Sequence, residues 1–352
     1  MELDPSGQRR LTEFFDRIGA ILGDDRRRAS FATYALGLLG DGERKSMEPI
    51  ASRTCPDPEG VDAAHQRLQH FLVDSNWSDR DVRRDAAGYV IDALTAHEAI
   101  QTWIIDDTGF LKQGNHSVGV QRQYTGSAGK IANCQLGVSL SLATATQQAP
   151  VDFELYLPKS WTEDPSRRME ARVPEEVVFK TKVELALDLV QRAVANDLPR
   201  GIVLADAFYG DEPSFRAGIR SLGLPYAVGV KSDIRVWRVD KKGCLHGEPL
   251  TVKRLAGDLR PKDFRRVTWR EGVKQSLHAR FAACRVVPAY RSKAEPPEQR
   301  EAVWLIIEWP EGEAEPTDYY FATLPKGWSK KRLVRVIKER WKTERVYALA
   351  AG

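Results

Sequence analysis

Two short apolar runs, about 100 residues apart, each end in an aspartate. The first covers residues 101–106 and leads into Asp107-Thr-Gly109, and the second covers residues 201–206. Apolar runs of this length are typical of buried strands, and we expect a turn at residues 106–109 to stop the first one. Polar side chains at two such strand ends can meet only if the fold pairs the strands.

The residues around these runs predict the rest of a mixed sheet. A helix is expected over 180–195, before the second run. A second helix over 213–222 leads from that run to a strand over 226–230. This β-α-β-α-β order predicts parallel pairing. Apolar stretches separated by glycines and polar residues predict an antiparallel meander before the first helix. Its strands are expected over residues 117–123, 134–145 and 151–157.

The first 97 residues read as helical. Apolar residues recur at helical spacing in two stretches, and Ser78 with Asp81 three positions later is a helix-start signal of the capping-box kind. The Pro56, Pro58 and Gly60 stretch divides the helices into two groups. Such a helical domain could bind DNA or only brace the rest of the chain.

After residue 231 the pattern becomes β-like and basic, which we interpret as an insertion over residues 232–317. Further strands are expected over 303–309 and 319–323. A last helix is expected from Ser329 to the C-terminus, with Leu333, Ile337, Trp341 and Ala348 on one stripe.

Length and composition limit the class of protein. A chain of 352 residues with 42% hydrophobic content suggests two or three domains with real cores. No run of about 18 apolar residues and no secretory signal is present, so we expect a cytoplasmic protein without membrane contact, near the nucleoid of a bacterium. The four cysteines lack paired zinc spacing and are expected to be reduced.

Positive charge is concentrated in two segments. Residues 231–270 and 326–345 each carry a net charge of +7, whereas the whole chain carries only +4, so the remainder is acidic. Basic clusters attract phosphate backbones and release counterions on binding. Solvated basic faces are the alternative interpretation.

Three carboxylates are candidates for metal chemistry: Asp106, Asp206 and, on the expected last helix, Glu344. Converging carboxylates repel one another unless cations neutralise them, and oxygen-only ligands suit Mg²⁺ or Mn²⁺. Two such ions can promote in-line phosphoryl transfer. Taken singly, an aspartate at a strand end is more often a turn former or cap, and Glu344 could simply pair with Arg340 four residues earlier.

A family resemblance strengthens the metal interpretation. The chain resembles the DDE transposases of bacterial insertion sequences over almost its whole length. The motifs that carry this resemblance are Trp103-Ile-Ile-Asp-Asp-Thr-Gly-Phe110, Gly114, His116-Ser-Val-Gly-Val120, Arg122-Gln-Tyr124, Gly129-Lys130, Asn133-Cys-Gln135, Val203-Leu-Ala-Asp-Ala207 and Tyr209-Gly210. The family's helical Tyr-Arg-Glu-Lys signature matches at Arg340 and Glu344, with Ile337 in place of its tyrosine and Ala351 in place of its lysine.

The resemblance implies an RNase H-like α/β fold: a mixed sheet with flanking helices, an N-terminal helical domain and an inserted, mainly β domain. The domains expected are 1–97, a catalytic core in two parts over 98–231 and 318–352, and the insertion over 232–317. The resemblance also implies that Asp106, Asp206 and Glu344 bind two Mg²⁺ or Mn²⁺ ions, with Arg340 orienting Glu344 or gripping a phosphate. The partner implied is double-stranded DNA, bound at terminal inverted repeats by a homodimer that cleaves the ends and transfers the strands.

Several residues are expected to contact DNA. They are Lys112, His116, Arg122, Lys130, Lys231, Arg235, Trp237, Lys241 and Lys242. His116 could instead have a structural role, and Trp237 and Trp269 could pack within the inserted sheet rather than stack on a base. Gly126-Ser-Ala-Gly-Lys130 lacks the first glycine and the final Ser or Thr of a phosphate loop.

The abrupt C-terminus suggests a second hypothesis. Relatives continue past the glutamate helix, whereas this chain ends at Gly352, as a truncated copy would. The alternative function is therefore a catalytically impaired DNA-binding remnant that regulates a full-length transposase.

Overall fold

The computed structural model describes residues 4–240, 242–271, 276–290 and 300–342, in two compact units that divide between Ala96 and His97. The first unit is helical, as predicted. Its elements are α1 (Pro5–Leu22), α2 (Asp25–Leu39), α3 (Met47–Thr54), η1 (Pro58–Gly60), α4 (Val61–Gln69), η2 (His70–Asp74) and α5 (Asp79–Thr95). The Ser78 hydroxyl accepts a hydrogen bond from the Asp81 N–H and so caps α5.

Small apolar clusters hold the helices of this unit together. Ile18, Leu22 and Phe71 are buried in one cluster, and Ile50 and Leu68 are buried in another. Gly37 of α2 lies against Ile50, because an added Cβ there would come within 2.2 Å of the isoleucine side chain. The close approach of α2 and α3 therefore depends on a residue without a side chain.

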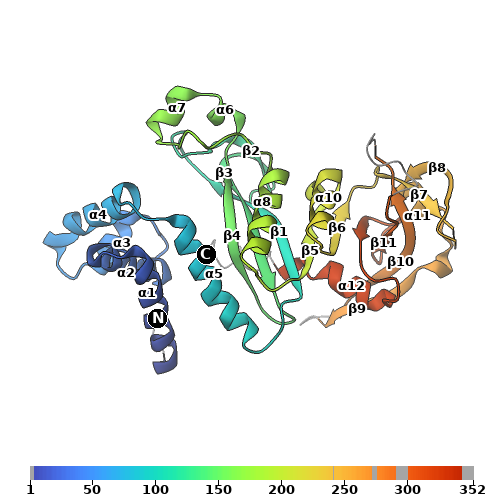
Figure 1. Ribbon diagram of the computed structural model, residues 1–352, viewed down its shortest axis with the longest axis horizontal. Coiled ribbons are helices and arrows are strands. Elements are labelled where there is room, and N and C mark those ends of the chain that lie inside the picture. Colours follow the sequence, from blue (N-terminus) through green and yellow to red (C-terminus); the bar gives the residue numbers. More distant parts are fainter. Residues whose placement is uncertain (1–3, 241, 272–275, 291–299, 343–352) are drawn as a thin grey trace. The chain divides into compact units, whose positions relative to one another are not determined.

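The second unit begins with the predicted mixed sheet (Figure 1). Its first elements are β1 (Thr102–Leu111), β2 (Gln121–Thr125), β3 (Lys130–Ala143), β4 (Gln148–Tyr156), α6 (Lys159–Thr162), α7 (Pro165–Glu170), α8 (Lys182–Ala195), β5 (Ile202–Ala205), α9 (Ala207–Gly210), α10 (Pro213–Ser221) and β6 (Tyr226–Val230). Strand β3 pairs antiparallel with β1, β2 and β4, whereas β5 lies parallel between β1 and β6. The order β4-β3-β1-β5-β6, with α8 and α10 connecting the parallel strands, is the RNase H-like arrangement expected from the motifs.

Two predicted strand boundaries were wrong. The turn expected at residues 106–109 does not exist, because β1 continues to Leu111 and Asp106 to Leu111 pair with Ser139 to Cys134 of β3. Backbone pairing with a long neighbour thus overrides the local turn preference of Asp107-Thr-Gly109. The strand expected over 117–123 is shifted, since β2 starts at Gln121 and is registered by its pairing with Lys130–Cys134.

The inserted strands extend the same sheet. They are β7 (Arg235–Val239), β8 (Leu245–Thr251), β9 (Arg265–Glu271), β10 (Ser276–Pro288) and β11 (Val303–Trp309), with α11 (Val252–Gly257) and η3 (Pro261–Asp263) between them. The second part of the expected core follows with β12 (Asp318–Ala322) and α12 (Lys330–Lys338). Strand β12 pairs antiparallel with β6, so the described strands form one sheet of 12 strands. The inserted residues are therefore mainly β, and they join the parallel strands through β12, which pairs with β11 on one side and with β6 on the other.

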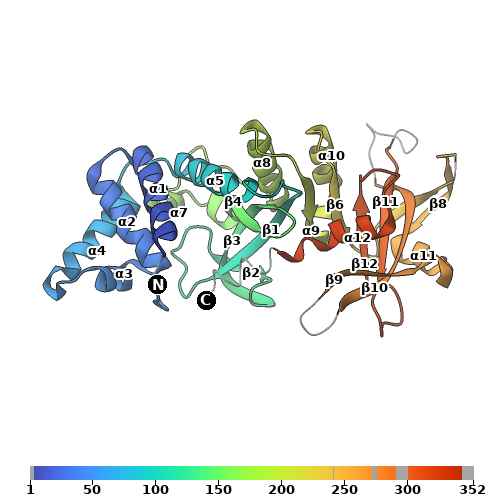
Figure 2. The ribbon, with the colours of Figure 1, turned by 90° about the horizontal axis from the view of Figure 1, so that it is seen from below.

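The helices of this unit lie on opposite faces of the sheet. Helices α8 and α10 pack together on one face (Figure 2). On the other face, Leu333, Val334 and Ile337 of α12 join Ile104 and Leu204 in a buried cluster. In the described part of the chain, no helix is long and apolar enough to cross a membrane.

Candidate active site

Asp106 and Asp206 lie side by side at the same edge of the parallel strand pair. The parallel register ends with Ile104 opposite Leu204, and each aspartate comes two residues later. Adjacent strands lie about 4.8 Å apart, so the two carboxylates belong to one site. The structure thus brings together two of the three predicted metal ligands, while Glu344 lies outside the described residues.

Side-chain alternation along β1 directs Asp106 to the face that α12 covers. Ile104 and Asp106 lie on the same side of the strand, and Ile104 packs in the α12 cluster. The Asp106 carboxylate is mostly buried, with 17% of its side chain exposed, and Arg340 Nη1 lies 3.3 Å from Oδ2. The Asp107 N–H donates to Oδ1 at 2.9 Å.

Burial raises the pKa of Asp106 to about 6. The positive charge of Arg340 and the hydrogen bond from the Asp107 N–H oppose this rise in pKa, whereas the negative charges of Asp206 and Asp107 add to it. The carboxylates therefore repel one another at a partly dehydrated site, where a cation would relieve the repulsion.

Asp206 is held by the short helix that follows it. Its Oδ1 accepts the N–H groups of Phe208, at 2.9 Å, and Tyr209, at 3.4 Å, so the carboxylate caps α9. Capping and ligand binding are compatible, because a carboxylate has two oxygens with several acceptor positions.

Two glycines allow α9 to approach the sheet. A Cβ added to Gly210 would lie 1.9 Å from the carbonyl oxygen of Gly229 on β6, and one added to Gly229 would lie 2.9 Å from the Ala207 nitrogen. The buried Arg216 guanidinium also donates to the Gly210 carbonyl. The backbone after Asp206 is thereby fixed from two sides.

We expect Gly210→Ala to destabilise the protein by about 1–3 kcal/mol, because the methyl group would overlap backbone that has no room to move. Urea denaturation measures this loss of unfolding free energy. Gly257→Ala is the matched control, since an added Cβ at Gly257 has no neighbour within 4 Å. Equal stability of the two variants would contradict the close packing of α9.

Arg340 lies just beyond the end of α12. The predicted helix was expected to continue through Arg340, but α12 ends at Lys338 with Glu339 as its C-cap.

Lys338 forms an ion pair with Glu308 of β11 at 2.5 Å, and the Tyr320 hydroxyl donates to the same carboxylate at 3.2 Å. Glu308 is buried, and burial raises its pKa while Lys338 opposes the rise.

A second lysine fixes the chain two residues after Arg340. The Lys342 side chain is buried, and its Nζ donates to the carbonyl oxygens of Thr144 at 2.7 Å and Ala145 at 3.0 Å. It also pairs with the Glu339 carboxylate. Residues 338–342, which we term the lysine-anchored segment, are thus fastened at both ends, and Arg340 between them reaches Asp106.

Asp107 belongs to the opposite face of β1. Its carboxylate forms an ion pair with Lys182 in the first turn of α8. The Lys182 ammonium also lies 4.0 Å from the centre of the Phe208 ring. This partner assigns Asp107 to the support of the site and agrees with the choice of Asp106 as the candidate ligand.

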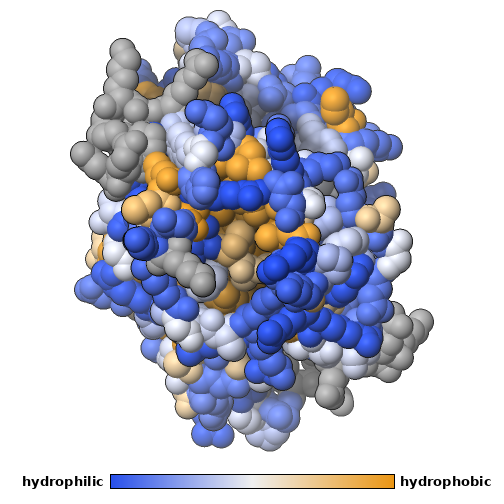
Figure 3. All heavy atoms as spheres, turned by 90° about the vertical axis from the view of Figure 1, so that its right-hand side faces the viewer, coloured by the Kyte–Doolittle hydropathy of each residue, from blue (hydrophilic) through white to orange (hydrophobic). Residues whose placement is uncertain are grey.

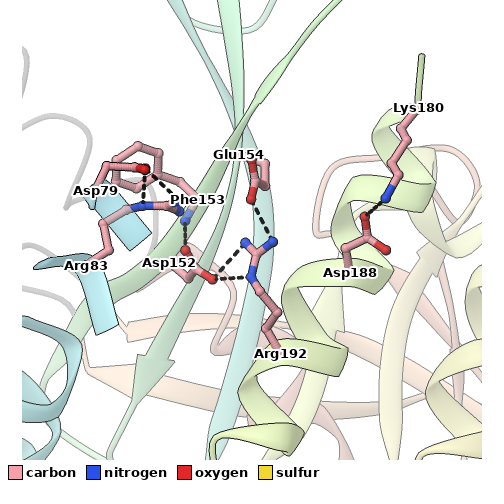
Figure 4. A network of polar contacts seen from close by, with 8 residues as sticks. All are labelled: Asp79, Arg83, Asp152, Phe153, Glu154, Lys180, Asp188 and Arg192. Atoms are coloured by element: carbon pink, nitrogen blue, oxygen red, sulfur yellow. Dashed lines mark hydrogen bonds and ion pairs between the residues drawn. The ribbon is translucent and has the colours of Figure 1, made fainter. Parts of the chain in front are cut away.

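Ion pairs hold α8 on the meander. Arg192 of α8 contacts Asp152 at 2.8 Å and Glu154 at 2.6 Å, and both carboxylates belong to β4 (Figure 4). Lys180 pairs with Asp188 at 2.6 Å near the start of the same helix. Arg192, which bridges two carboxylates, thus holds one end of α8, and Thr181 caps the other end beside Lys182.

The two aspartates fit a hard divalent cation. Their oxygen atoms are the ligands that Mg²⁺ and Mn²⁺ prefer, and their mutual repulsion favours a cation between them. Within the residues that the structure describes, no three His, Cys, Asp or Glu side chains form a metal-binding group. A third protein ligand would have to come from elsewhere, and Glu344 remains the prediction for it.

The predicted DNA contacts fall into two groups. The first group belongs to the β1–β3 region and consists of Lys112, His116, Arg122 and Lys130. His116 is exposed, and its Nδ1 lies 4.0 Å from a Glu170 carboxylate oxygen. The register places Arg122 opposite Asn133 and Lys130 opposite Thr125, so these two cations occupy different faces.

The second group lies across the sheet. Strand β7 is six strand positions from β1, or roughly 30 Å at ordinary strand spacing. Arg235 donates to the Pro249 carbonyl, and Lys231 pairs with Asp211 at 3.1 Å. Trp237 is half-buried and Lys242 is exposed, while Lys241 lies outside the described residues. Figure 3 views this end of the molecule, where hydrophilic residues surround a hydrophobic area.

The fold and the neighbouring aspartates define an α/β protein with an acidic site beside the parallel strands of its mixed sheet. A family model described as "DDE superfamily endonuclease" matches residues 14–276, so the chain belongs to this family and the expected family is confirmed.

The chain is 27% identical over 224 residues to the "Probable transposase for insertion sequence element IS701" of Microchaete diplosiphon. That match covers 63% of this chain and about half, 54%, of the relative. The NurA nuclease structure from Sulfolobus solfataricus matches 79% of this chain and 86% of its own, at 11% identity and a TM-score of 0.26, which is too low to bear on the fold.

Sequence reasoning missed the residues that support the site. The capping box of Thr181 and Glu184 marks the start of α8, but nothing in the sequence pairs Lys182 with Asp107 across 75 residues. Lys342 and Glu308 were likewise missed, because a lysine in a basic segment reads as exposed. Their roles depend on contacts between distant elements.

Proposed function

We propose that this chain is a transposase that binds the terminal inverted repeats of its own element and hydrolyses the phosphodiester there. The freed 3′ hydroxyl then attacks a phosphodiester of the target DNA, whose own 3′ oxygen is the leaving group. The observation that carries the proposal is the proximity of Asp106 and Asp206, each two residues past the last parallel pair of β1 and β5. Membership of an endonuclease family and the likeness to an insertion-sequence transposase support it. In this proposal two copies of the chain act together, because an element has two ends.

Asp106 and Asp206 would hold Mg²⁺ or Mn²⁺, and Glu344 would complete the site for a second ion. Divalent ions at such a site supply charge stabilisation for the attacking and leaving oxygens of an in-line phosphoryl transfer. Arg340 orients the Asp106 carboxylate through its 3.3 Å contact. The N–H groups of Phe208 and Tyr209 orient Asp206 through hydrogen bonds. Both carboxylates would therefore have fixed orientations before DNA binds.

The proposed function is tested by incubating the full chain with duplex DNA that carries the inverted repeats flanking its gene. We expect Mg²⁺- or Mn²⁺-dependent cuts that leave a 3′ hydroxyl at the repeat, and joining of that end to a second duplex. EDTA and a duplex with scrambled repeats are the controls. Binding of the repeats without cleavage by either metal would contradict the proposal.

A further inference from the structure

The face of the sheet that carries Asp106 also carries exposed aromatic and apolar side chains. Phe110 lies four residues further along β1 on the same face, and 53% of it is exposed. Tyr124 of β2 and Ile131 of β3 pair with each other, and the strand register places both on this face. They are 64% and 60% exposed. Large apolar side chains in such numbers at one place indicate an interaction surface.

The ring of Phe110 extends over the neighbouring strand β3, where Gly137 has no side chain to displace it. A Cβ added at Gly137 of β3 would stand 3.5 Å from Cε2 of Phe110, so the ring lies beside the bare backbone of Gly137. Gly137 pairs with Thr108 on one side and with Leu155 on the other, and Leu155 is 39% exposed. The Phe110 ring thus reaches the backbone opposite Thr108, which lies between Phe110 and Asp106 on the same strand.

Cations alternate with the aromatic residues on this face. The exposed Arg122 lies two residues before Tyr124 on β2 and pairs with Asn133. Lys112 follows β1 directly, and its N–H donates to the Asn133 carbonyl at 3.0 Å. This hydrogen bond continues the pairing of β1 with β3 by one residue, and side-chain alternation then places Lys112 on the same face as Phe110. Asn133 is thus flanked by one cation on each side, and its side chain is tied to the Lys112 and Gly114 carbonyls.

We propose that this face, defined by Phe110, Lys112, Arg122, Tyr124 and Ile131, binds an unpaired DNA strand whose bases stack on the two rings. Lys112 and Arg122 are placed to neutralise the phosphates of that strand. Aromatic rings interleaved with cations bind single strands because every base offers a π-face, whereas the bases of an intact duplex are stacked on one another. The inference rests on the proposed function, since it treats the strand as the DNA end that enters the carboxylate site.

The test is fluorescence anisotropy of the full chain with a labelled single-stranded oligonucleotide, in EDTA so that no cleavage occurs. We expect Phe110→Ser and Tyr124→Ser each to weaken binding about tenfold, and Phe110→Trp and Tyr124→Trp to bind like the parent. Met169→Ser and Val178→Ser remove apolar side chains elsewhere that are 79% and 63% exposed, and they should leave binding unchanged. Thermal unfolding of each variant confirms that it folds.

The cations have a separate readout. We expect Lys112→Gln and Arg122→Gln each to reduce the slope of log affinity against log salt by about 0.7, the value for one phosphate contact on a single strand. A fully paired duplex without frayed ends should show little effect of the two aromatic substitutions.

Two outcomes would overturn the inference. One is parental affinity for the single strand in both serine variants. The other is a change from dimer to monomer in sedimentation with unchanged affinity for the single strand, which would assign the face to a second copy of the chain. A third result separates the inference from the proposed function. If the parent cleaves no DNA, yet only the serine variants lose single-strand binding, the binding surface is supported and the proposed function is contradicted.

Discussion

Replacing either Asp106 or Asp206 with asparagine should lower the rate of metal-dependent DNA cleavage by about 10³-fold or more. Asparagine keeps the shape of the side chain but removes the charge that holds a cation, and charge stabilisation by such an ion is worth several kcal/mol in the transition state. Single-turnover cleavage of a repeat-containing duplex measures the rate constant. DNA affinity should change little, because neither residue is needed to hold the backbone phosphates.

Asp107→Asn is the matched control for Asp106→Asn. The two residues are neighbours on β1, but Asp107 points to the opposite face and pairs with Lys182. We expect cleavage by the Asp107 variant to stay within about one order of magnitude of the parent, because the lost pair supports α8 rather than an ion. A larger loss for Asp107→Asn than for Asp106→Asn would show that the ligand was assigned to the wrong aspartate.

Lys342→Met should lower the free energy of unfolding by about 1–3 kcal/mol, the usual cost of leaving buried hydrogen-bonding groups without a partner. The variant keeps an apolar side chain of similar length, but it leaves Glu339 and the Thr144 and Ala145 carbonyls without the ammonium group. Urea denaturation measures the loss. Cleavage should fall as well, because the lysine-anchored segment would no longer hold Arg340 beside Asp106.

Lys331→Met provides the control for that experiment. Lys331 lies on α12 but is exposed, so its loss should change stability by less than about 0.5 kcal/mol. If Lys342→Met is as stable as Lys331→Met, the anchoring of the segment by Lys342 is wrong.

The elements that could be predicted from the sequence are those with strong local signals. Strands β6 and β11 begin and end at the predicted residues, and α8 starts within two residues of the prediction because Thr181 caps it. Each of these segments combines apolar periodicity with clear flanking signals, so local propensity and tertiary packing agree.

The misplaced elements are those whose ends depend on a partner strand. Nothing local shows that β1 continues through Asp107-Thr-Gly109, because that extension is dictated by ten consecutive pairings with β3. The end of α12 at Lys338 was also missed. Lys338 pairs there with Glu308 of β11, and Lys342 donates to a carbonyl just after β3, so both lysines contact segments far away in the sequence.

The candidate site shows the same division. The proximity of Asp106 and Asp206 was predictable because each follows an apolar run, and parallel pairing brings such positions together. The contact of Arg340 with Asp106 spans 234 residues, and the sequence signature suggested Glu344 as the arginine's partner instead. Pairing across such distances depends on the whole fold and leaves no local pattern.

The most direct measurement of the central claim is metal rescue of Asp106→Cys on DNA that carries the repeats. A thiolate is a poor ligand for Mg²⁺ and a better one for the softer Mn²⁺. If Asp106 binds the catalytic ion, the variant should be inactive in Mg²⁺ and recover cleavage in Mn²⁺, while Asp106→Ala stays inactive in both metals. Equal activity of the Cys and Ala variants in both metals, at the level of the parent, would contradict a metal-binding role for Asp106.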